Sequence, residues 1–142
     1  ILISYKGKHI IFLQMTTTPK EATELLNQKK LNESNFGFIH YSSALAHYMD
    51  KDFNIAMEVF TILQNRYFYG NWGIVESDSI KFNNEAIKNE NGGDILGAYI
   101  LSTGKKIWIK TVGYGLTEDK MDLENYSKMD YNNTCIMFPE DY

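Results

Sequence analysis

The chain of 142 residues has little of several residue types that often indicate a function. Its single cysteine, Cys135, excludes an internal disulfide and a zinc site built from cysteines. It has one arginine, Arg66, and its 18 acidic residues outnumber the 14 basic ones, which disfavours a general nucleic-acid-binding protein. No apolar run approaches the roughly 20 residues that a transmembrane helix needs. These absences predict a cytoplasmic protein without a membrane segment.

What the chain does contain is enough for a folded core. Hydrophobic residues make up 44% of the sequence and aromatic residues 14%, while charged residues reach only 23%. Such a composition is typical of a globular domain, and the length is that of one domain. We therefore expect a single domain over residues 1–142.

The first two thirds of the chain are mainly helical by pattern, after an N-terminal β-hairpin over residues 1–15 that turns at Gly7. Capping residues and apolar residues at helical spacing predict four helices. Their ranges are 19–30, 42–50, 54–66 and 78–90. The third of these helices is expected to be largely buried.

The last third changes to the two-residue alternation of β-strands. Residues 95–101 and 105–112 form a predicted hairpin, and residues 134–138 form a further strand that stops at Pro139. With the N-terminal hairpin, this order predicts an α+β fold. Its antiparallel sheet would have about five strands, with about four helices covering it.

An acidic segment, residues 113–131, separates the last two predicted strands. Its five acidic residues and two lysines give a charge of 2 − 5 = −3, and tyrosines lie between them. Loops often carry function, and exposed tyrosines are favoured in protein interfaces. We expect a partner-binding surface here. It comprises Tyr114, Glu118, Asp119, Asp122, Glu124, Tyr126, Asp130 and Tyr131.

Several short motifs in the second half of the chain resemble the pattern of one known family. They are RYFYGNWG (66–73), Asp78 with Asn84-Glu85, Lys106-Ile107-Trp108-Ile109 with Thr111, and Thr134, Ile136, Pro139, Glu140 and Tyr142. On these motifs, residues 58–142 resemble a family of small, uncharacterised bacterial proteins common on plasmids, phages and other mobile elements. Some members are labelled plasmid-related proteins or restriction-system subunits. The resemblance implies an accessory product of a mobile genetic element.

The chain departs from this family pattern at three polar positions. The family histidine and aspartate of the first motif are Tyr67 and Asn71 here, and a late family arginine is Tyr131. A family site built on those side chains would have lost its chemistry in this chain. Function is then expected from the acidic segment or from the residues that are kept.

Arg66, Trp72 and Trp108 allow two interpretations. A guanidinium beside aromatic rings binds phosphate or carboxylate, which would make a small anionic-ligand site or a degenerate enzyme. Alternatively, Arg66 ends the third helix and Trp72 fills the core between two glycines, which is the interpretation that we favour.

Other reactive residue types form no recognisable site. His40 and His47 have neither the spacing nor the neighbours of a metal site, and Cys135 lies in an apolar strand without an adjacent base. We predict no catalytic residue, no metal and no cofactor.

The sequence therefore predicts a non-enzymatic protein that binds another protein, rather than nucleic acid or a membrane. The most specific hypothesis is a counter-defence inhibitor, directed against a CRISPR or restriction nuclease. Its spaced carboxylates would imitate a phosphate backbone and occupy the basic surface of a nuclease complex.

Overall fold

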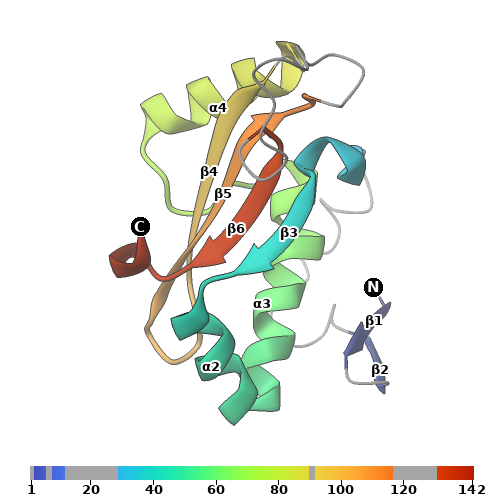
Figure 1. Ribbon diagram of the computed structural model, residues 1–142, viewed down its shortest axis with the longest axis vertical. Coiled ribbons are helices and arrows are strands. Elements are labelled where there is room, and N and C mark those ends of the chain that lie inside the picture. Colours follow the sequence, from blue (N-terminus) through green and yellow to red (C-terminus); the bar gives the residue numbers. More distant parts are fainter. Residues whose placement is uncertain (1, 6–7, 12–28, 90–91, 117–130) are drawn as a thin grey trace.

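The computed structural model describes residues 2–5, 8–11, 29–89, 92–116 and 131–142, and it has an α+β fold, as predicted. Its centre is a sheet of four strands in the order β3-β6-β5-β4 (Figure 1). The strands are β3 (Phe38–Tyr41), β4 (Gly93–Ile100), β5 (Lys106–Tyr114) and β6 (Asn133–Met137). β5 pairs antiparallel with both β4 and β6, whereas β3 pairs parallel with β6.

The prediction of a purely antiparallel sheet of five strands was wrong in two respects. The N-terminal hairpin forms, as β1 (Leu2–Tyr5) and β2 (Lys8–Ile11), but these strands make a separate two-stranded sheet. The strand β3 was missed, because it has only four residues and its partners begin at Asn133. A local sequence pattern does not indicate a parallel pairing between segments so far apart in the sequence. Because β3 pairs in parallel, the sheet is mixed.

Three of the predicted helices are confirmed: α2 (Ser43–Lys51), α3 (Phe53–Asn65) and α4 (Ser77–Asn89). Side-chain oxygens begin two of them. Ser42 Oγ accepts from the Leu45 N–H at 3.2 Å, and Asp52 Oδ1 accepts from the Asn54 N–H at 2.9 Å. The predicted helix at 19–30 lies outside the described residues, except for its last two. Short 3-10 turns occur at Glu33–Phe36 (η1), Tyr67–Tyr69 (η2) and Pro139–Asp141 (η5).

The two faces of the sheet differ in what covers them. On the inner face, side chains of all four strands face α3, which lies behind the sheet in Figure 1. The register places these residues together: Ile39, Tyr41, Ile95, Tyr99, Ile107, Ile109, Thr111, Thr134 and Ile136. The outer face carries the alternate residues, and several of them are partly exposed. Within the described residues, the outer face is therefore the open one.

The two edges of the sheet also differ. Along β4, the Asn83 side chain of α4 donates to Leu96 O at 2.8 Å and accepts from Leu96 N at 3.1 Å. Trp72 and Ile74 bond to the backbone of Ala98, and Gly73 allows this approach because a Cβ there would lie 2.0 Å from Ala98 O. The β4 edge is thereby closed. Within the described residues, β3 has a strand neighbour on one side only.

Among the helices of the described residues, none has the length and apolar character needed to cross a membrane.

Candidate functional site

The corner at residues 66–73 is built into the core. Tyr67 follows α3, and its hydroxyl lies 2.6 Å from Thr111 Oγ1, which is 2.7 Å from Thr134 Oγ1. Thr134 in turn donates to the backbone oxygen of Phe36 at 2.7 Å. Each hydroxyl has one proton, and Thr134 uses its proton for the bond to Phe36. Thr134 therefore accepts from Thr111, and Thr111 accepts from Tyr67. The corner is therefore anchored to two strands of the sheet.

Arg66 and Trp72 have the structural positions that the sequence favoured. Arg66 is the C-terminal cap of α3, and its guanidinium carbon lies 4.9 Å from the ring centre of Tyr99. Trp72 is only 4% exposed, and its indole N–H donates to Asn84 Oδ1 at 3.1 Å. Burial raises the pKa of Tyr99 well above its ordinary value, and the nearby Tyr67 adds to this rise while Arg66 opposes it.

Trp108 lines a groove whose lining includes neither Arg66 nor Trp72. It pairs with Ala98 and projects from the outer face. The Trp72 ring instead contacts the Tyr67 ring on the inner side, with 5.4 Å between the ring centres. The anionic-ligand alternative required Arg66, Trp72 and Trp108 to line one pocket. This geometry separates them, because the sheet lies between the two tryptophans.

The structure describes only two residues of the predicted partner-binding surface. Tyr114 is 1% exposed and its ring packs edge-on against Phe36 at 5.0 Å, so it belongs to the core. Tyr131 is half-buried. The remaining residues of that surface lie outside the described residues: Glu118, Asp119, Asp122, Glu124, Tyr126 and Asp130.

Cys135 and His40 become neighbours through the parallel pairing of β3 with β6. Cys135 is half-buried on the outer face, and burial raises the pKa of its thiol, with a smaller contribution from Asp141. A raised thiol pKa disfavours the thiolate that a nucleophile needs. His40 Nε2 lies 3.1 Å from Asn133 Oδ1, and His47 is exposed. In the described parts of the chain, no three potential metal-binding side chains come together.

A groove of about 390 Å³ lies on the outer face, and we call it the outer groove. Aromatic rings from three separate elements line it: Phe82 from α4, Trp108 from β5, and Tyr142 after η5. Phe82 is 65% exposed and Tyr142 is 74% exposed. Trp108 is half-buried and meets the Tyr142 ring edge-on, with 6.0 Å between the ring centres. Its lining is completed by Ser79, Asn83, Asp94, Ile95, Leu96 and Lys110.

Two charged side chains line the outer groove. Lys110 is half-buried, and its ammonium donates to the Tyr142 hydroxyl at 2.7 Å and lies 4.4 Å from the centre of that ring. Asp94 is exposed, and its carboxylate accepts from the backbone N–H of Gly113 at 3.3 Å. The groove therefore combines aromatic walls with one cation and one anion.

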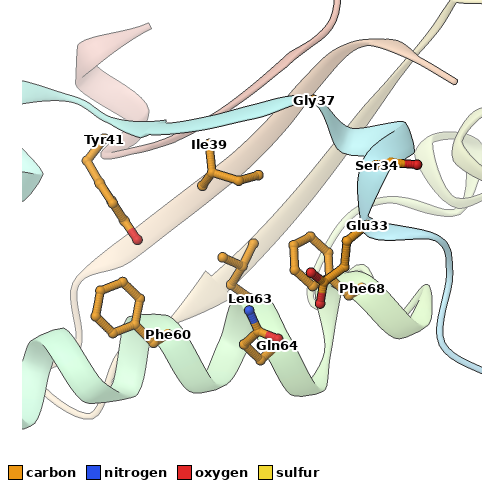
Figure 2. Close-up of a pocket in the computed structure, with 9 residues that line it drawn as sticks. All are labelled: Glu33, Ser34, Gly37, Ile39, Tyr41, Phe60, Leu63, Gln64 and Phe68. Carbon is orange, nitrogen blue, oxygen red and sulfur yellow. The ribbon is translucent and has the colours of Figure 1, made fainter. Parts of the chain in front are cut away.

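A second groove, of about 490 Å³, lies between β3 and α3, and we call it the edge groove (Figure 2). Ile39 and Tyr41 point from β3 toward Leu63 and Phe60 of α3. Several of its apolar walls belong to the hydrophobic core; Leu63 and Phe68, for example, are buried. Because the outer groove presents mostly exposed aromatic rings, it is the better candidate for contact with a partner.

Sequence reasoning found Trp108 but missed Phe82, Lys110 and Tyr142 as its neighbours. A local signal existed for the first two. Phe82 stands among polar residues in a helix, and the alternation in residues 106–110 places Trp108 and Lys110 on the face opposite Ile107 and Ile109. Their convergence with Tyr142 depends on the tertiary fold.

We compared the chain with protein-family models, with curated proteins and with solved structures, and none of these comparisons found a match.

Proposed function

We propose that this protein is a non-enzymatic binding protein whose partner is another protein, held at the outer groove. One observation carries the proposal: Phe82, Trp108 and Tyr142 converge from three elements on the open face of the sheet. Tryptophan, tyrosine and phenylalanine are enriched in the cores of protein interfaces. An exposed phenylalanine and tyrosine beside a half-buried tryptophan supply the hydrophobic centre that a partner would bury.

The open face favours this use of the groove. The rings of Phe82 and Tyr142 are largely exposed and lie outside the core, so these two rings contribute little to the stability of the free protein. Their removal from water would occur only on association. Burying an aromatic side chain of this size contributes roughly 1.5–3 kcal/mol.

The decisive experiment compares two substitutions of exposed apolar residues on the outer side. Phe82→Ser removes a wall of the outer groove. Ile100→Ser is the matched control, since Ile100 is 55% exposed and does not line that groove. A protein captured from cells that produce this chain is purified, and its affinity for the three forms is measured by calorimetry.

We expect Phe82→Ser to weaken the affinity at least tenfold, an estimate of about 1.4 kcal/mol or more, while Ile100→Ser leaves it within about twofold. Circular dichroism should show both variants folded, because both side chains are exposed. Equal affinities for the wild type and Phe82→Ser would refute the outer groove as the binding site.

A second candidate function is inhibition of a nucleic-acid-processing nuclease, as a counter-defence product of a mobile element. The charge of −3 over residues 113–131 favours it, because a basic nucleic-acid groove attracts spaced carboxylates. Replacing Asp119, Asp122 and Glu124 with the corresponding amides should then abolish inhibition of the captured nuclease. Inhibition that survives in this triple variant would count against the acidic segment.

A further inference from the structure

We infer that the outer groove is selective for an acidic peptide segment, one that places an apolar side chain between Phe82 and Trp108 and a carboxylate on Lys110. The inference rests on the proposed function and specifies the chemistry of the partner. It also separates the two candidate functions, since the nuclease candidate requires a basic partner surface.

The charge on Lys110 is the first feature that favours an acidic segment. Its ammonium has three donors, and the described structure engages it only with the phenol of Tyr142, by one hydrogen bond and by contact with the ring. No carboxylate of the described residues forms an ion pair with it. Two of its three donors therefore have no partner among the described residues, and an arriving carboxylate can accept from them.

The negative charge in the groove, on Asp94, already has a hydrogen-bond donor. Asp94 is exposed, so water solvates its carboxylate, and it already accepts a backbone N–H from Gly113. Lys110, by contrast, has only the neutral phenol of Tyr142 as a hydrogen-bond partner within the described residues. The electrostatic preference of the groove therefore follows Lys110 and favours an anion.

The position of the aromatic walls is the second feature that favours such a segment. Trp108 and Lys110 lie two residues apart on the same face of β5. Leu96 is the partner of Lys110 on β4, and it lies toward α4 and Phe82. An apolar side chain that enters between Phe82 and Trp108 thus lies within a few residues of a group that meets Lys110. This spacing suits a peptide with an apolar residue one to three positions from a glutamate or aspartate.

The test uses an array of synthetic ten-residue peptides with the full 142-residue protein. Each peptide carries one leucine, phenylalanine or tryptophan, and one glutamate, glutamine or lysine at one to three positions from it. Binding is followed through the NMR resonance of the Trp108 indole N–H in the isotopically labelled protein. Lys110→Met keeps the aliphatic stem and removes the charge. Lys106→Met is the control, because Lys106 lies on the same strand and face outside the groove lining.

We expect the best glutamate peptides to bind about tenfold more tightly than their glutamine counterparts and to shift the Trp108 indole resonance. Lys110→Met should abolish this preference, and Lys106→Met should preserve it. The inference is overturned if no peptide shifts the resonance, if glutamate gives no advantage, or if the advantage survives in Lys110→Met.

Failure of the inference and failure of the proposed function give different results. Peptides that shift the Trp108 resonance without regard to charge would refute the selectivity and leave the groove as a binding site. A captured partner whose affinity is unchanged by Phe82→Ser would refute the binding site itself.

Discussion

At the scale of single residues, the buried polar groups of the core differ in whether their hydrogen bonds are satisfied. The hydroxyls of Tyr67, Thr111 and Thr134 satisfy one another and end on a backbone carbonyl. Asn65, by contrast, is fully buried at the end of α3, and neither polar atom of its side chain has a hydrogen-bond partner among the described residues. These two arrangements predict opposite effects of replacing a polar group with an apolar one.

The hydroxyl chain should be most sensitive at its middle. Thr134→Val would leave the Phe36 carbonyl without this donor and the Thr111 hydroxyl without its acceptor, at a cost of about 2–3 kcal/mol. Tyr67→Phe removes only the first donor and should cost about 1 kcal/mol. Urea denaturation of both variants measures the difference. An equal or reversed order would contradict the donor direction assigned here.

Asn65 should be replaceable with a gain in stability. Leucine has a similar branched shape, and its substitution removes an amide whose desolvation is not compensated. We expect Asn65→Leu to raise the free energy of unfolding by about 1–3 kcal/mol, measured by urea denaturation. A loss of stability would mean that the amide has a favourable interaction in solution.

At the scale of elements, the Asn83 side chain and the backbone of residues 72–74 together close the β4 edge. The two bonds of the Asn83 amide to Leu96 replace those of a neighbouring strand. Asn83→Ala should accelerate hydrogen exchange of the Leu96 amide at least tenfold, because its acceptor is lost. Asn84→Ala is the control, since Asn84 bonds to the Trp72 indole and not to β4. Unchanged exchange in Asn83→Ala would show that this amide does not hold the edge.

The elements predicted correctly are those whose signals are local. Ser42 and Asp52 cap their helices within three residues, and the 95–112 hairpin joins strands adjacent in sequence. The burial of Trp72 also followed from its sequence context. The sequence could not indicate that β3 pairs with β6, because such pairing depends on a contact across more than 90 residues. The outer groove was only partly predictable for the same reason: Trp108 was singled out, but Tyr142 reaches it through the tertiary fold.

At the scale of the whole molecule, the buried tyrosines predict how stability depends on pH. Burial raises the pKa of both Tyr67 and Tyr99 above the ordinary value of 10.0. Their contribution to the free energy of unfolding is complete below about pH 10. It is lost progressively above about pH 10, because at that pH the unfolded chain binds fewer protons than the folded one. Each tyrosine should lower stability by about 1.4 kcal/mol per pH unit in this range.

Urea denaturation between about pH 9 and about pH 11 measures this dependence. The Tyr99→Phe variant should show a shallower decline than the wild type, because one of the two buried phenols is absent. The comparison cancels the ionisation of lysines, which both proteins share. An identical slope in the variant would contradict the assignment of the decline to Tyr99.

The interior position of β6 has a consequence for the order of synthesis. Residues 133–137 are the last strand of the described residues, yet they lie between β3 and β5. A nascent chain that has emerged as far as β5 holds two strand edges with no neighbour to join them, and its Thr111 lacks Thr134 as a partner. Exposed strand edges of this kind promote aggregation and attract chaperones. The four-stranded sheet can therefore be completed only after translation has passed Met137.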